Sequence, residues 1–312
     1  MTPFSRLLPV FVLVLLSLLC PGRLHAQLPG QSPEQAAYVS PYRFADAVKD
    51  PGLTRDFQED PRAITNWQNW SETPYREWHD LRVIRRLHST WGPYYRAFRA
   101  PRGAESRQAD WFQKRVVAAA RVVRNTAPYA HHHMAQWSVP DDRRWTEARP
   151  HPYAPGFGFD CSDFTHFAYS YGVGISLKTG IDAQANLREA PMHLADGAEI
   201  QVRAQRLFDV HDGYVKSYAD LTSQLQPGDL LYIRSNAELS NRISHVIMWM
   251  GNLAYDTNGK DPHLVMDSHG AKVRDSQGAL IPSGPELRPF AENSYYFRSF
   301  DHVVRYFPLQ PQ

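Results

Sequence analysis

Cysteine is scarce in this sequence, whose 312 residues include only Cys20 and Cys161. Cys20 ends an apolar N-terminal run, and the residue before it is Leu19. A lipid attachment site would need a small residue at that position, which argues against a lipoprotein. The rest of the chain holds one thiol, so a domain built on a framework of disulfides is excluded.

An excess of charge of either sign is also missing. The chain has 34 Lys and Arg residues against 32 Asp and Glu. The first 26 residues contain Arg6 and Arg23 but no acidic residue, so without them both counts are 32. A neutral chain gives no general reason to expect nucleic acid or an anionic membrane as a partner.

Long hydrophobic runs are confined to the N-terminus. Arg6 precedes the apolar run Leu7–Cys20, and Ala26 offers a small residue for cleavage. This pattern predicts a secretory signal peptide over residues 1–26, cleaved after Ala26. The run is short for a membrane-spanning helix. We therefore expect a periplasmic or secreted protein of about 286 residues, with no stable membrane insertion after signal removal.

The stretch FDCSDFTHFAYSYGVG, residues 159–174, predicts a helix with one buried face. Its apolar stripe has helical spacing and consists of Phe164, Phe167, Ala168 and Tyr171. Asp160 can cap the start of this helix, and Gly172 and Gly174 can end it. Cys161 then lies in the first turn, where the helix dipole favours a thiolate of depressed pKa.

Two interpretations of Cys161 follow. A free cysteine is often just a small buried apolar residue. In an exported protein, however, a single thiol is exposed to oxidation and has nothing to pair with, so its presence needs a reason. Catalysis supplies that reason, and we interpret Cys161 as a nucleophile.

The first part of the mature chain differs in character from the rest. Residues 27–105 are polar and rich in aromatics, and DLRVIRRLH at 80–88 has helical spacing, so we predict a helical N-terminal region there. Its tryptophans suit sugar binding, although packing is their commoner role. A second predicted helix, 106–125, opens a domain over 106–312. The run His131–His133 lacks the spacing of a zinc site, and we expect no metal.

Short strands separated by turns dominate the C-terminal half. The segments that predict strands are 230–233, 243–250, 264–267, 295–297 and 303–306. Residues 176–224 are polar, and their pattern specifies no structure. A helical part followed by short strands indicates an α+β fold with an antiparallel sheet.

A cysteine nucleophile needs a base, and the base needs a polar group that orients it. His245 is the candidate base, because it stands in the predicted strand ISHVIMWM, residues 243–250, where an imidazole can face a cleft. The alternative is a histidine at a strand edge with no function.

Three blocks, GFDCSDF, LQPGDLLYI and ISHVIMWMGN, together resemble the NlpC-type peptidoglycan endopeptidases, which are papain-like cysteine hydrolases. The resemblance spans roughly residues 110–275. It implies Cys161 as nucleophile and His245 as base, with no cofactor. It also implies that Asp160, Ser162 and Tyr129 bind the substrate, Asp160 as the anchor for the free amine of a stem peptide.

Two departures from the family pattern concern the substrate site and the third catalytic residue. The chain has Tyr129 followed by Ala-His-His-His where the family has Tyr-Trp-Gly-Gly, and an unusually long segment precedes Cys161. The family's third catalytic position falls on Asp267 or His269, which stand two apart and so share a strand face. Spacing does not decide between them. We favour His269, because Asp267 can be explained as a turn cap.

These observations predict an exported cysteine peptidase that cleaves an amide bond in peptidoglycan stem peptides. The first alternative is an amidase or acyltransferase of the same fold acting on a substrate outside the wall. The second is a catalytically silent wall-binding protein that uses the aromatic N-terminal region.

Overall fold

The structure is a computed structural model that describes residues 37–49, 98–125, 129, 160–236, 240–270 and 273–307. Three predicted features lie outside the described residues: the signal peptide 1–26, the helix over 80–88, and the histidine run His131–His133.

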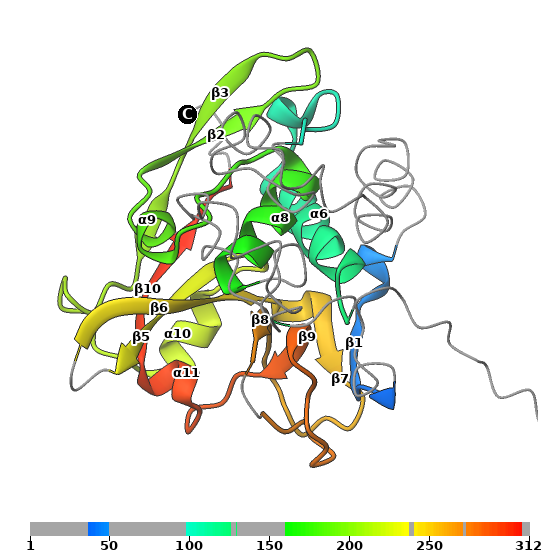
Figure 1. Cartoon of the computed structure of the whole chain (residues 1–312), viewed down its shortest axis with the longest axis vertical. Coiled ribbons are helices and arrows are strands. Elements are labelled where there is room, and N and C mark those ends of the chain that lie inside the picture. Colours follow the sequence, from blue (N-terminus) through cyan, green and yellow to red (C-terminus); the bar gives the residue numbers. More distant parts are fainter. Residues whose placement is uncertain are drawn as a thin grey trace, which may run out of the picture.

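An antiparallel sheet of six strands forms the centre of the described chain (Figure 1). Its strands in spatial order are β4 (Gln205–Leu207), β10 (Phe300–Arg305), β5 (Leu230–Asn236), β6 (Ser240–Trp249), β8 (Leu264–His269) and β9 (Gly284–Pro289). The segments 230–233, 243–250, 264–267 and 303–306 overlap four of these strands, β5, β6, β8 and β10, as predicted. Together with the helices this confirms the α+β class.

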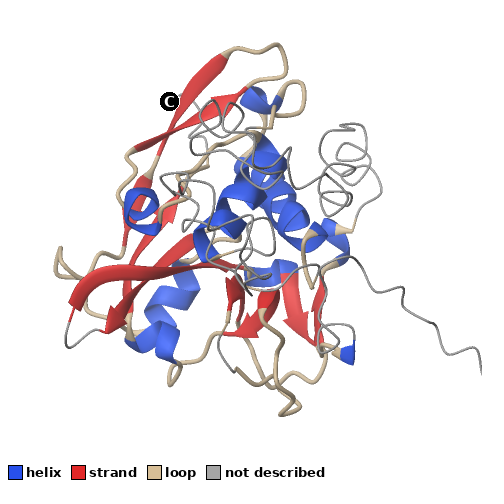
Figure 2. Ribbon diagram, viewed as in Figure 1, coloured by secondary structure: helices blue, strands red, loops and turns tan. Residues whose placement is uncertain are grey.

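Helices cover both faces of the sheet (Figure 2). Leu230 and Tyr232 of β5 pack into the core that contains α6 (Ala109–Val122) and α8 (Cys161–Val173). Leu231 and Ile233, the alternate residues, pack into the core that contains residues of α10 (Tyr218–Gln224) and α11 (Tyr295–Arg298). Successive strand side chains point to opposite faces, so burial on both sides explains the nearly continuous apolar runs of β5 and β6.

Helix α8 lies in the core between the sheet and α6, and all of its residues are buried. It begins after Asp160 and ends at Gly174, whose positive φ of 76° suits a glycine. Gly172 was expected to help end the helix but lies inside it. A Cβ atom at Gly172 would stand 3.0 Å from the backbone oxygen of Arg115, so the glycine allows α6 and α8 to pack closely.

The described part of residues 27–105 belongs to the same core. It contains β1 (Tyr42–Phe44) and two 3-10 turns, Asp46–Val48 and Ala104–Ser106, while the predicted helical character of the region stays a prediction. β1 pairs with β7 (Ala254–Asp256), which the turn Gly251–Leu253 precedes. Tyr42 and Phe98 are buried in the cluster that holds α6 and α8. A domain boundary near residue 105 stays a prediction.

One predicted strand was wrong. Residues 295–297 begin the short helix α11, where the side chain of Ser294 caps the backbone N–H of Phe297. Tyrosine and phenylalanine favour strands, but their preference is weak beside a cap and a buried face. The segment 176–224, left unassigned, holds α9 (Ile181–Ala185), the hairpin of β2 (Glu189–His193) and β3 (Glu199–Arg203), then β4 and α10.

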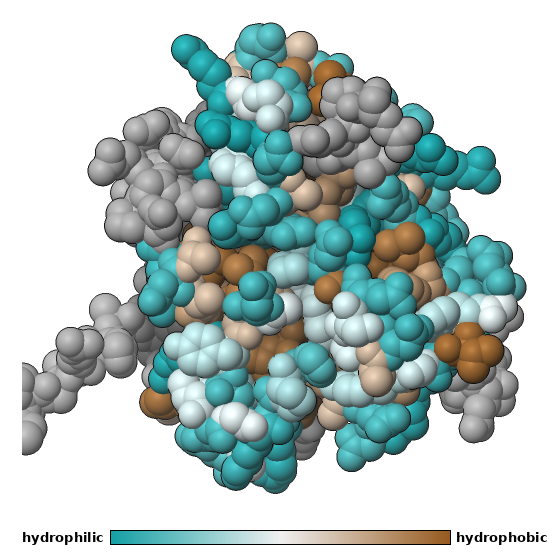
Figure 3. Space-filling model, turned by 180° about the vertical axis from the view of Figure 1, so that it is seen from behind, coloured by the Kyte–Doolittle hydropathy of each residue, from teal (hydrophilic) through white to brown (hydrophobic). Residues whose placement is uncertain are grey.

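The surface shows few large apolar side chains. Among the described residues those exposed are Val39, Ile200, Val215, Tyr255, Leu280 and Tyr295. Figure 3 shows small, separate apolar patches on an otherwise mostly hydrophilic face. Within the described ranges, no helix has the length and hydropathy needed to cross a membrane.

Candidate active site

Cys161 is the first residue of α8, as the capping pattern predicted. Asp160 Oδ1 accepts a hydrogen bond from the backbone N–H of Asp163 at 2.8 Å, which fixes the helix start. The Cys161 side chain is buried, with 4% of the residue exposed. The backbone N–H of Val246 in β6 donates a hydrogen bond to the Cys161 sulfur. This contact places the thiol beside the strand that carries His245.

The strands β6 and β8 are paired only at Met248 with Met266 and at Trp249 with Val265. His245 and Asp267 therefore lie beyond the paired part, where side chains have room to meet. His245 Nε2 lies 2.6 Å from Asp267 Oδ2, and both side chains are buried. The imidazole of the predicted base thus has a carboxylate on one ring nitrogen.

This contact favours Asp267 over His269, the residue preferred from the sequence, as the orienting residue, and the role itself stays a prediction. The His269 ring lies beside the His245 ring, with centroids 4.6 Å apart, while Asp267 makes the hydrogen bond. Asp267 does not cap a turn, because it lies within β8 and pairs with Glu286 of β9. Burial lowers the pKa of His269 to about 4, so its imidazole is neutral at neutral pH.

Two residues that sequence reasoning missed hold Asp267 in place. Arg288 in β9 donates to Asp267 Oδ1 at 2.9 Å, and Tyr296 in α11 donates to Oδ2 at 2.7 Å. Burial alone would raise the pKa of Asp267, but Arg288 and His245 outweigh it and keep that pKa well below its ordinary value. The sequence of β9, GPELRP, contains no clear signal, because Arg288 is accompanied there by the charged Glu286.

The predicted substrate-binding residues are placed around the thiol. The Ser162 hydroxyl is buried within hydrogen-bonding distance of Asp160 Oδ1 and of the Thr179 carbonyl. Tyr129 is half-buried, and its ring meets the edge of His269 with centroids 6.4 Å apart. Burial raises the pKa of Tyr129, so its phenol stays protonated. Substrate binding by these residues stays a prediction.

The thiol does not have the low pKa expected from its place in a helix first turn. Burial raises the pKa of Cys161 well above its ordinary value, and the carboxylates of Asp160 and Asp163 raise it further. Between the described residues Cys161 and His245 the structure has no hydrogen bond. The effect of the helix dipole is therefore outweighed by burial and by the two carboxylates.

We expect iodoacetamide labelling of Cys161 to rise with pH and to reach its midpoint above about 8.5, the value of an ordinary thiol. The reason is that only the thiolate reacts and burial disfavours it. The rate should be measured from pH 5 to 10. The same protein unfolded in denaturant supplies the ordinary midpoint. A plateau already present below pH 7 would show a thiolate-imidazolium pair instead.

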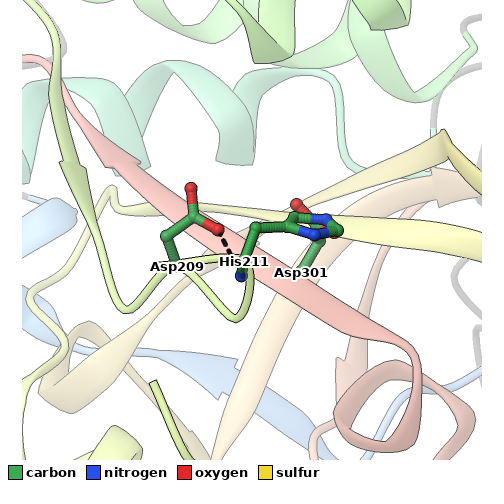
Figure 4. Close-up of side chains that lie close together, drawn as sticks. All are labelled: Asp209, His211 and Asp301. Carbon is green, nitrogen blue, oxygen red and sulfur yellow. Dashed lines mark hydrogen bonds and ion pairs between the residues drawn. The ribbon is translucent and has the colours of Figure 1, made fainter. Parts of the chain in front are cut away.

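A second cluster of polar side chains lies at the other end of the sheet. Its members have ligand-type atoms within 4.8 Å of one another: Asp209, His211 and Asp301 (Figure 4). Their carboxylates are already bound by cationic side chains, because Asp209 accepts from Arg206 and Asp301 lies 3.3 Å from Nε of Arg234. His302 adds a contact of 2.7 Å to Asp301. A contact of 2.9 Å between His211 Nε2 and Asp301 Oδ2 joins the loop after β4 to β10.

Two solved structures align with part of this chain. A structure of an NlpC/P60 family protein from Bacillus cereus ATCC 10987 aligns with 49% of this chain and 33% of its own length, at 21% identity and a TM-score of 0.29. NlpC2 from Trichomonas vaginalis aligns with 62% of this chain and 47% of its own length, at 16% identity and a TM-score of 0.30.

The chain thus spans less than half the length of either structure. A comparison with curated proteins gives no match. Residues 144–276, which contain Cys161, His245 and Asp267, match the sequence model of the NlpC/P60 family, and the family resemblance predicted from the sequence is confirmed.

Proposed function

We propose that this chain is an exported cysteine peptidase that hydrolyses an amide bond in the stem peptides of bacterial peptidoglycan. NlpC/P60 proteins are generally cell-wall peptidases, and residues 144–276 match that family. The observation that carries the proposal is the hydrogen bond of 2.6 Å between His245 and Asp267. His245 is followed in β6 by Val246, whose backbone N–H contacts the Cys161 sulfur.

The first half of the reaction forms an acyl-enzyme. His245 accepts the thiol proton through its other ring nitrogen as the Cys161 sulfur attacks the substrate carbonyl carbon. A general base at the moment of attack is needed because burial disfavours a resting thiolate. Backbone N–H groups at the start of α8 stabilise the oxyanion, and the imidazolium then protonates the leaving amine as the carbon-nitrogen bond breaks.

The second half is hydrolysis. His245 takes a proton from water as the water oxygen attacks the thioester, and returns it to the sulfur as the carbon-sulfur bond breaks. Asp267 keeps the imidazole in one tautomer and stabilises its protonated form in both halves. The catalytic hydrogen bond between Cys161 and His245 forms in the substrate complex, because such bonds are often long in the free enzyme.

Three further assignments belong to this proposal. Residues 1–26 are removed on export, which places the enzyme in the periplasm or outside the cell. Residues 27–105 precede a hydrolase domain over 106–312. Asp160, Ser162 and Tyr129 contact the stem peptide, and Asp160 receives its free amine.

The test is a digest of purified peptidoglycan with the protein from residue 27 onward, with the products identified by mass spectrometry. Cleavage within the stem peptide, absent from a digest with Cys161→Ala, supports the proposal. Binding to the wall without cleavage by the wild type favours a silent wall-binding protein. Hydrolysis of other amides or esters, with the wall untouched, favours the amidase or acyltransferase alternative.

A further inference from the structure

Tyr296 contacts two members of the candidate site at once. Its hydroxyl donates to Asp267 Oδ2 at 2.7 Å, and His245 Nε2 approaches the same oxygen at 2.6 Å. Its ring also stacks on the His245 imidazole, with centroids 5.7 Å apart and planes 13° from parallel. One buried side chain of α11 therefore touches both the candidate base and the carboxylate that orients it.

We propose that Tyr296 is a positioning residue, which sets both the orientation and the proton affinity of His245 through these two contacts. The proposal rests on the proposed function, because it assigns Tyr296 to the same Cys161, His245 and Asp267 site. Tyr296 contacts neither the sulfur nor the attacked carbonyl in this scheme, so it acts on the reaction through His245 and Asp267.

The stacked ring restricts the imidazole. The imidazole of His245 can rotate about its Cβ–Cγ bond, and the hydrogen bond with Asp267 Oδ2 holds it at one atom only. The nearly parallel ring of Tyr296 limits that rotation by an offset stacking contact. The hydroxyl in turn limits rotation of the carboxylate, whose other oxygen is bound by Arg288. Tyr296 thus restricts both the imidazole of His245 and the carboxylate of Asp267.

The hydroxyl of Tyr296 also stabilises the negative charge of Asp267 by donating a hydrogen bond to it. Three donors share that carboxylate: Arg288 on Oδ1, and Tyr296 and His245 on Oδ2. Burial raises the pKa of Tyr296, so its hydroxyl stays a donor at neutral pH. If this donor is removed, more of the carboxylate charge acts on His245, which favours the imidazolium and raises the pKa of His245.

Other ionisable groups act on the same pair from the surrounding elements. They are His269 on β8, Arg288 on β9, Tyr129, and Cys161 on α8, and Asp160 and Asp163 at the start of α8 act in turn on Cys161. All of them stay in place when only the Tyr296 hydroxyl is removed. A change of pKa in that variant therefore reports the hydroxyl itself.

The adjacent residue supplies a matched control. Tyr295 is in the same helix turn, but its hydroxyl donates to the carbonyls of Arg234 and Ser235 at the end of β5. Tyr295→Phe removes one hydroxyl from α11 without touching Asp267. It shares any loss of helix stability with Tyr296→Phe but none of the contacts to the site.

The experiment measures the pKa and tautomer of His245 by nitrogen NMR in a Cys161→Ala background, with the signal assigned from its loss in His245→Gln. We expect Tyr296→Phe to raise this pKa by roughly half a unit to one unit, the size of one hydrogen bond. Tyr295→Phe should leave it unchanged. With Cys161 present, Tyr296→Phe should lower kcat roughly three- to tenfold with little change in KM, and shift the acid limb of its pH profile upward.

An unchanged pKa and tautomer in Tyr296→Phe, or equal shifts in Tyr295→Phe, would overturn the proposal. The NMR readout needs no turnover, so the two proposals fail separately. A shifted pKa in a protein that leaves peptidoglycan intact supports the positioning role while rejecting the proposed substrate.

Discussion

Replacing Cys161 with alanine is expected to abolish turnover, with a loss of at least about 10⁴-fold. The thiol forms the covalent bond in the proposed reaction, and no neighbouring side chain replaces its sulfur. The assay is release of product from peptidoglycan or from a defined stem peptide under saturating substrate. Undiminished turnover would reject the cysteine hydrolase.

The same substitution should leave the fold intact. Cys161 is a small side chain at the first residue of α8, and the cap of that helix is made by Asp160 and not by the thiol. Alanine removes one buried sulfur, so we expect a change in unfolding free energy of about 1 kcal/mol or less. Thermal unfolding of both proteins checks that a lost activity is not a lost fold.

Replacing Asp267 with asparagine is expected to have the second largest effect, a loss of roughly 10⁴-fold in kcat. The asparagine side chain can present an N–H group to His245 and so stabilise the wrong tautomer. It also provides no charge to balance the imidazolium. His269→Ala should lower the rate less than about tenfold, because the His269 ring only packs beside His245.

The two variants should also differ in stability. Arg288 is fully buried against Asp267, so neutralising the carboxylate leaves a buried guanidinium without its counter-charge. Losing one partner of such a pair costs about 3 to 5 kcal/mol, which thermal unfolding can detect. Should His269→Ala cause the steep loss of rate while Asp267→Asn stays active, the assignment of the orienting residue to Asp267 is wrong.

Much of this arrangement could be predicted from the sequence because it depends on local patterns. The apolar stripe and the cap at Asp160 placed Cys161 in the first turn of a helix, and four strand segments were found from their composition. The three blocks around Cys161, Leu225–Ile233 and His245 predicted the resemblance to the NlpC/P60 family, whose model matches residues 144–276. Each of these signals lies within about ten consecutive residues, so no knowledge of distant contacts was needed.

Other features were decided by contacts between distant segments. The spacing of Asp267 and His269 put both on one face of β8, but Arg288 and Tyr296, on elements that follow in the sequence, fix Asp267 as the partner of His245. Likewise the helix start alone predicts a low pKa for Cys161. Only its burial beneath the sheet, beside two carboxylates, reverses that direction.

What the sequence by itself determined is the resemblance to the NlpC/P60 family, whereas the exported compartment and the roles of Cys161 and His245 stay predictions. Only the tertiary structure decided that Asp267 hydrogen-bonds to His245, that burial raises the pKa of Cys161, and that residues 295–297 belong to a helix carrying Tyr296. The physical reason is how far apart in the chain the interacting residues are. Helical and strand periodicity are set by neighbours in the chain, whereas a pKa or a hydrogen bond depends on every group that packing brings within a few ångströms.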